Sequence, residues 1–140
     1  MIINTTHLDK EKKKLINNLV GKPFSLWQSL FFKKKGSHRM IIHNLSNDFN
    51  PHFKSYNNLL YANIELREVG IIIRISANYK TISWIIPFYK LIIYNTDYFS
   101  IYVGDNYIKF RKDKNYIINK KFINSLITEK VCYSKKFCFN

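Results

Sequence analysis

Residues 60–87 read LYANIELREVGIIIRISANYKTISWIIP, and this stretch decides the fold. From Leu60 to Arg67 apolar side chains alternate with polar ones, which is the period-2 pattern of a strand with one buried face. Gly70 breaks the run, and Asn78 marks a tight turn because Asn tolerates a positive φ. Such short connections join antiparallel neighbours, since a parallel partner needs a long crossover. The stretch therefore predicts consecutive antiparallel strands.

The same alternation continues beyond this stretch, as far as Lys112. An additional strand is expected near residues 39–45, and the polar residues 46–58, which include Pro51, are expected to form a long loop. We therefore predict a six- to seven-stranded antiparallel meander over residues 39–112. A strongly twisted sheet of this size tends to curl or close into a barrel, because closure hides its edge strands.

Residues 6–35 are expected to be helical. Thr6 followed by Asp9 resembles a capping box. Five apolar residues then share one helical face: Leu8, Leu15, Ile16, Leu19 and Val20. Pro23 ends this first helix and suits the first turn of a second, shorter one. Residues 33–36, which are three lysines and a glycine, suit the end of that second helix.

The C-terminal part of the chain predicts a further helix over residues 117–131. Its apolar side chains share one face: Phe122, Ile123, Leu126 and Ile127. Residues 132–140 show no period and are expected to form a loosely held tail. Together these elements predict a single α+β domain over residues 1–140, with N-terminal helices, an antiparallel sheet and a C-terminal capping helix.

The chain carries a formal net charge of +14, because 23 Lys and Arg residues face only 9 Asp and Glu residues. An AT-rich genome would account for the many lysines but not for the shortage of acids, whose codons are also available there. Net charge bears on partners rather than on fold. Two interpretations stay open: an acidic partner such as nucleic acid, anionic lipid or an acidic protein, or a merely solvated basic surface.

The cysteines and the hydropathy of the chain bear on its cellular location. Cys132 and Cys138 are the only two cysteines, and two ligands are too few for a closed zinc site. We expect no metal and no other cofactor. The sequence shows neither a signal-peptide pattern nor an apolar run of the roughly 18 residues that a membrane span needs. We therefore expect a cytoplasmic protein with free thiols, with a disulfide as the open alternative.

A short segment of one predicted strand, Ile86-Pro87-Phe88-Tyr89-Lys90-Leu91, resembles the apolar-Pro-aromatic-x-x-apolar segment of bacterial pleckstrin-homology-like (PH/GRAM-type) domains. Residues 122–126 resemble the aromatic-Ile-x-x-Leu end of such domains. The resemblance covers about residues 39–131. It implies a PH-like barrel of about seven antiparallel strands with a terminal capping helix. It also implies a binding or scaffolding module without catalytic residues.

The outward face of the last predicted strands interleaves tyrosines with basic residues: Tyr102, Tyr107, Lys109, Arg111 and Lys112. Arg67 and Arg74 would extend this face. Single-stranded nucleic acid requires rings that stack on bases and cations that neutralise phosphates, and the same residues also suit anionic lipid headgroups. Tyrosine pairs well across exposed strand positions, so a purely structural role is the alternative.

Residues 23–35 offer a different candidate surface. Aromatic residues precede a run of bases there: Trp27, Phe31, Lys33, Lys34 and Lys35. Such a helix can lie on a membrane surface, with its rings inserted and its lysines at lipid phosphates. The alternative is that the same helix covers an open face of the sheet.

Motifs typical of enzymes are not visible in the sequence. His38, His43 and His52 lie near Asp48, but their spacing matches no metal-ligand pattern. Nucleophile motifs and phosphate-binding glycine loops do not occur. We therefore predict a non-enzymatic binding or scaffolding module of unknown ligand, with an acidic partner. Single-stranded nucleic-acid binding and peripheral membrane association are the alternatives, and an uncovered edge strand would allow a homodimer.

Overall fold

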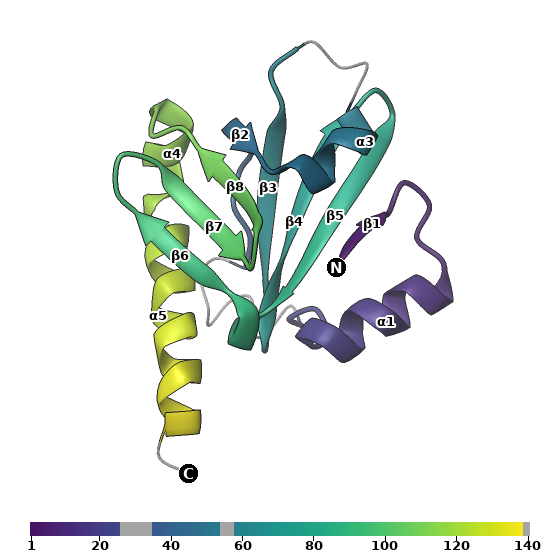
Figure 1. Ribbon diagram of the computed structural model, residues 1–140. Helices are drawn as coiled ribbons and strands as arrows, with labels where there is room; N and C mark the ends of the chain where they lie inside the picture. Colours follow the sequence, from purple (N-terminus) through teal and green to yellow (C-terminus); the bar gives the residue numbers. More distant parts are fainter. Residues whose placement is uncertain (26–34, 54–57, 139–140) are drawn as a thin grey trace.

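The computed structural model describes residues 1–25, 35–53 and 58–138 of the chain. The strands in this part are β1 (Ile2–Asn4), β2 (Met40–Leu45), β3 (Tyr61–Arg67), β4 (Gly70–Ala77), β5 (Lys80–Pro87), β6 (Ile92–Asn95), β7 (Phe99–Val103) and β8 (Asn106–Phe110). The helices are α1 (Lys10–Val20), α3 (Asn50–Phe53), α4 (Lys114–Ile118) and α5 (Lys120–Cys138), with 3₁₀ turns η1 (Asn47–Phe49) and η2 (Phe88–Lys90). The predicted α+β class is confirmed (Figure 1).

The eight strands form one antiparallel sheet with the order β1-β5-β4-β3-β2-β8-β7-β6. Strand β2 lies in the middle, where it pairs with β3 on one side and with β8 on the other. Its register shifts between Ile42 and Asn44, and a bulge of this kind bends a strand. The two halves of the sheet, β1-β5-β4-β3 and β8-β7-β6, therefore pass across one another instead of lying flat (Figure 1).

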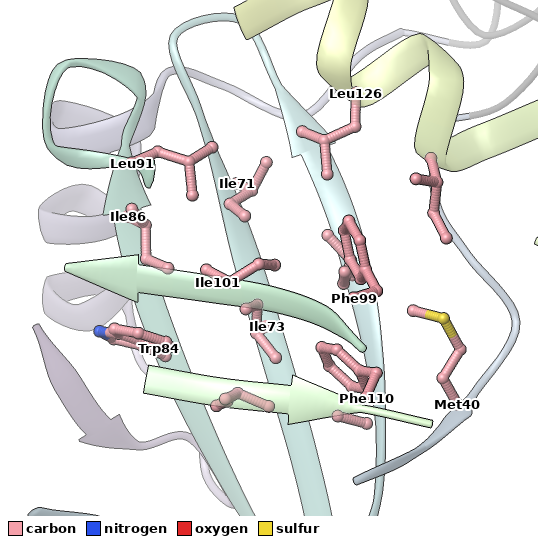
Figure 2. Packing of buried hydrophobic residues seen from close by; sticks show 14 of the residues in the cluster. Met40, Ile71, Ile73, Trp84, Ile86, Leu91, Phe99, Ile101, Phe110 and Leu126 are labelled. Carbon is pink, nitrogen blue, oxygen red and sulfur yellow. The ribbon is translucent and has the colours of Figure 1, made fainter. Parts of the chain in front are cut away.

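The main hydrophobic core fills the space between the two halves. Figure 2 shows Ile71, Ile73 and Trp84 of β4 and β5 in one cluster with Ile101 and Phe110 of β7 and β8. Helix α5 adds three fully buried side chains to this cluster, Phe122, Ile123 and Leu126. The capping helix is therefore part of the core that holds the two halves together.

A second, smaller cluster buries the opposite face of β4 and β5 beneath α1, and its members are Ile16, Val20, Ile72 and Ile85. The helix approaches the sheet closely because position 70 is a glycine. A Cβ atom on Gly70 would lie 2.4 Å from the carbonyl oxygen of Ile86 and 2.5 Å from Cγ1 of Val20. Strands β4 and β5 are thus covered on both faces.

The sheet differs from the predicted meander in two respects. It has eight strands instead of six or seven, because β1 adds a strand of 3 residues, which is too short to show an alternation in the sequence. The predicted closure into a barrel is wrong, since the sheet is open and has β1 and β6 at its edges. Helix α5 covers the core, so burial of the apolar face does not require closure.

The N-terminal helix begins later than predicted, at Lys10. Asp9 is its N-cap instead of Thr6, and the Asp9 carboxylate accepts a hydrogen bond from the Lys12 backbone N at 2.8 Å. Thr6 belongs to the sheet edge, where its Oγ1 accepts a hydrogen bond from the Thr81 backbone N at 3.0 Å. Leu8 of the predicted apolar face therefore precedes the helix and is 40% exposed, and Leu15 within α1 is 40% exposed as well.

Two segments near the sheet also differ from the prediction. The expected loop over residues 46–58 contains η1 and α3, and it buries Phe49 with its ring centroid 5.3 Å from that of Trp84. The period-2 pattern predicted beyond β5 resumes only with β6 at Ile92, because η2 follows the end of β5. The polar composition of residues 46–58 gave no sign of η1 and α3, because a single buried aromatic residue does not create a periodic pattern.

The C-terminal helical region is longer than predicted and consists of α4 and α5. Asp113 caps α4 by accepting hydrogen bonds from the backbone N atoms of Asn115 and Tyr116. Helix α5 continues to Cys138, so the predicted loose tail is helical over residues 132–138. Cys132 is an exposed free cysteine. None of the described helices is both long and apolar enough to cross a membrane.

The β4–β5 hairpin yields a first prediction. Asn78 and Tyr79 form its turn with φ values of 50° and 65°, and the Tyr79 side chain is fully exposed. A two-residue turn with two positive φ values prefers Gly at its second position. We expect Tyr79→Gly to raise the free energy of unfolding by about 0.5–1 kcal/mol, measured by urea denaturation.

Tyr79→Ala is the matched control, because it removes the same ring but keeps a Cβ atom in the left-handed conformation. It should give no stabilisation. Equal stabilities of the Gly and Ala variants would contradict this account of the turn.

Candidate functional site

Three tyrosines and a lysine lie in a row on the outer face of the sheet. Tyr94 of β6, Tyr102 of β7 and Tyr107 of β8 come from three neighbouring strands, with consecutive ring centroids 5.3 Å apart. Lys109 of β8 continues the row, since its Nζ lies 5.4 Å from the ring centroid of Tyr107. We name these four residues the tyrosine–lysine face. It unites three of the residues predicted from the sequence with Tyr94, which was not predicted.

Side chains alternate between the two faces of a strand, and this alternation places these four on the outer face of the sheet. The alternate residues of β7 and β8 point into the core and are fully buried: Phe99, Ile101, Ile108 and Phe110. The register pairs Tyr102 directly with Tyr107 and places Tyr94 opposite Ser100. Aromatic pairs across strands stabilise a sheet, so the row has a structural role whether or not a ligand binds.

Other basic and aromatic side chains extend this outer face towards β2. Arg111 directly follows β8 and is exposed. His43, which lies in the bulge of β2, stacks on Tyr98 with ring centroids 4.3 Å apart. Arg39, just before β2, lies over the Tyr61 ring at 4.7 Å from its centroid. The bases and rings that the sequence interleaves are therefore interleaved in space as well.

Arg67 and Arg74 belong to the other half of the outer face, where both bind the carboxylate of Glu65. Oε2 of Glu65 accepts a hydrogen bond from Nε of Arg67 at 2.7 Å and from Nη2 of Arg74 at 3.3 Å. Arg67 is only 6% exposed, and its Nη1 also donates to Oδ1 of Asn17 and to the carbonyl oxygen of Gly21. Arg67 therefore attaches the C-terminal end of α1 to β3 and does not extend the exposed basic surface.

Lys112 also lies apart from the tyrosine–lysine face. Its Nζ donates to the carbonyl oxygen of Thr96 and lies 5.3 Å from the ring centroid of Tyr116. Strand β8 ends at Phe110, so strand alternation no longer sets the direction of this side chain. Among the residues suggested for a membrane surface, Lys35 is exposed, whereas four lie outside the described residues: Trp27, Phe31, Lys33 and Lys34.

An apolar groove of about 580 Å³, which the sequence did not indicate, lies between β6 and α5. Strand β6 and the residue before it contribute Leu91, Ile92, Ile93 and Asn95, and α5 contributes Ile127, Lys130, Val131, Ser134 and Lys135. Ile92 and Val131 are 48% and 45% exposed, which is high for large apolar side chains. The groove joins a strand to a helix far along the chain, and two of its lining residues, Ser134 and Lys135, fall in the predicted tail, so no local pattern could reveal it.

Lys130 is a partly buried residue of this groove. Its Nζ donates to the carbonyl oxygen of Phe88 at 2.5 Å. Partial burial removes water from the ammonium group and lowers the pKa of Lys130. Strand β6 forms the floor beside it and is an edge strand, since within the described residues it pairs only with β7.

The histidines of the sequence do not assemble into a site in the structure. His43 stacks on Tyr98, whereas the His52 ring lies against Phe53 with centroids 6.3 Å apart. Within residues 1–25, 35–53 and 58–138, no group of three or more His, Cys, Asp or Glu side chains could hold a metal ion.

No protein-family model, no curated protein and no solved structure matches this chain. The class that the geometry defines is an α+β domain with an open antiparallel sheet and one long helix across its core. Its two distinguishing surfaces are the groove at the free edge of β6 and the tyrosine–lysine face outside β6, β7 and β8.

The contacts of Glu65 give a second prediction. Replacement of Glu65 by Gln removes the charge that compensates the buried Arg67 guanidinium. We expect Glu65→Gln to lower the free energy of unfolding by about 2 kcal/mol, because a buried charged group then loses its partner. Urea denaturation at neutral pH measures the change.

Glu11→Gln is the control, because it makes the same chemical change at an exposed position in the first turn of α1. Its effect should be no more than a few tenths of a kcal/mol. The assignment of Arg67 as the attachment of α1 fails if both variants unfold at the same urea concentration.

Proposed function

We propose that this protein is a non-enzymatic binding module that captures an extended, acidic segment of a partner protein between β6 and α5. The observation that carries this proposal is the position of the apolar groove directly beside an edge strand. Edge strands present unpaired backbone N–H and C=O groups, which are a ready template for another strand. An extended peptide can therefore add to β6 with main-chain hydrogen bonds and place alternate side chains in the groove.

The size and lining of the groove suit such a ligand. Its volume of about 580 Å³ lies within the range of about 300–1,000 Å³ that is typical of binding pockets. Ile92 and Val131 face it from the strand and from the helix, and both retain exposed apolar surface. Burial of that surface by apolar peptide side chains would supply the main favourable term of binding.

The charges around the groove favour an acidic segment. Lys130 and Lys135 line it from α5, and the whole chain has a net charge of +14. The ammonium group of Lys130 is already partly withdrawn from water, so a carboxylate beside it would interact more strongly than at a fully hydrated lysine. The same arrangement disfavours basic segments through like-charge repulsion.

The relationship to PH-like domains is a part of this proposal. Seven consecutive strands, β2 to β8, are followed by helices that end in α5, which is the order of elements that the resemblance implies. The open sheet departs from the barrel expected of that family. The resemblance supports a binding module, but fold alone does not identify a ligand, so the proposed ligand is inferred from the groove.

A peptide selection tests the proposal. Random peptides displayed on phage are selected on the full chain, and enriched sequences are synthesised. We expect acidic peptides with apolar residues at alternate positions. Their binding should slow hydrogen–deuterium exchange at the amides of β6, because strand addition gives these amides new acceptors. Selected peptides that leave β6 exchange unchanged would contradict the proposal.

The variant Val131→Glu tests whether peptides bind in the groove or at another surface of the protein. Val131 is largely exposed, so the fold should tolerate a carboxylate there. We expect it to weaken peptide binding at least about tenfold, because an acidic ligand then meets a like charge and loses an apolar contact. Ser125→Glu adds the same charge at an exposed position of α5 outside the groove, and it should bind normally.

A second copy of this chain is the competing occupant of β6. In that case the protection of β6 would appear without peptide and would increase with protein concentration. That result would overturn the proposed peptide site in favour of a homodimer.

A further inference from the structure

The tyrosine–lysine face adjoins the groove, because Tyr102 pairs with Ile92 of the groove lining, but none of its four residues lines the groove. We propose that this face is a second binding site, and that its ligand is single-stranded nucleic acid. The inference is independent of the proposed peptide site, because it depends on different residues and on a different kind of ligand.

The aromatic side chains carry the first part of the inference. Tyr94, Tyr102 and Tyr107 stand side by side on three consecutive strands, so their spacing follows the strand separation of about 4.8 Å. Tyr94 is 54% exposed and ends the row at the edge of the sheet. Nucleobases stack on such rings irrespective of sequence. A duplex keeps its bases inside, so the face suits unpaired strands.

The charge distribution carries the second part. Among the eight strands, Glu65 is the only acidic residue, and its carboxylate is engaged by Arg67 and Arg74 on the other half of the sheet. Neither of these ion pairs includes Lys109 or Arg111. Cations that are not neutralised by carboxylates remain free to bind phosphates, and the release of counterions then favours binding.

The surroundings of the two ends of β8 differ in charge, and this difference indicates the path of the phosphate backbone. At the Tyr107 end, Asp48 and Asp105 line a hollow of about 430 Å³, which would repel phosphates. At the other end, Arg111 lines a hollow of about 300 Å³ together with three asparagines: Asn44, Asn50 and Asn58. The phosphate backbone therefore runs from Lys109 towards Arg111. Amide groups of this kind can form hydrogen bonds with the Watson–Crick edges of bases, which are free only in single strands. In the structure Nδ2 of Asn44 donates to the Tyr107 hydroxyl at 3.5 Å, and Nδ2 of Asn50 donates to Oδ1 of Asn47 at 3.3 Å.

Fluorescence anisotropy with labelled oligouridylate and oligothymidylate tests the role of the rings. Tyr94→Ala should weaken binding about fivefold or more, because each aromatic–base stack contributes at least that factor. Tyr94→Phe is the matched control, since it keeps the ring and should retain binding. The two oligonucleotides distinguish RNA from DNA as the preferred ligand, and binding of either one supports the proposal.

Charge reversal tests the phosphate path. We expect the double variant Lys109→Glu with Arg111→Glu to reduce the dependence of log K on log salt by about 1.4, which corresponds to two lost phosphate contacts on a single strand. Lys13→Glu with Lys14→Glu makes the same change in net charge on the exposed side of α1 and should bind like the wild type. Equal effects of the two double variants would show attraction by net charge alone and would overturn the assigned face.

Two further outcomes would also overturn the inference. One is equal or tighter binding of a duplex of the same length. The other is binding of vesicles that contain anionic lipid through Lys109 and Arg111, without any binding of oligonucleotides. The groove variant Val131→Glu should bind oligouridylate normally, so failure of the peptide site and failure of this site are distinguishable.

Discussion

Burial of both faces of β4 and β5 is the constraint on which the rest of the structure depends. Isoleucines at consecutive positions of β4 point alternately to the main core and to the small cluster under α1. One face needs the β6–β8 half of the sheet together with α5, and the other needs α1. Helix α1 therefore packs on the outer face of the half of the sheet that contains β4 and β5. Within the described part of the chain no helix is packed on the outer face of β6, β7 and β8, which carries the tyrosine–lysine face.

The sequence predicts the parts of this arrangement that depend on neighbours along the chain. Period-2 alternation locates most of the strands, and Asn78 locates a turn of positive φ. The same patterns cannot decide between an open sheet and a barrel, because that choice depends on whether a distant helix covers the core. They also misplace the start of α1, since Thr6 and Asp9 both suit a helix N-cap, and only the contact of Thr6 with β5 decides between them.

The candidate sites show the same limit. Tyr102, Tyr107 and Lys109 could be predicted because strand parity alone sends them outward. Arg67 has the same parity, but α1 lies over its side of the sheet and turns it into a buried attachment point. The groove beside β6 could not be predicted at all. It joins a short strand to a helix about 35 residues later in the chain, and its apolar side chains form no periodic pattern that differs from an ordinary core.

The position of β2 between β3 and β8 has a consequence for the order in which the protein assembles. Strands β3, β4 and β5 pair with neighbours in sequence, so their contacts close short loops. Strand β2 pairs with β8, and β1 pairs with β5, across about half of the chain or more. Loop-closure entropy makes these distant pairings slow to form. The β3–β5 hairpins are thus expected to form before the long-range pairings, and β1, with 3 residues at one edge, is expected to dock last and to detach first.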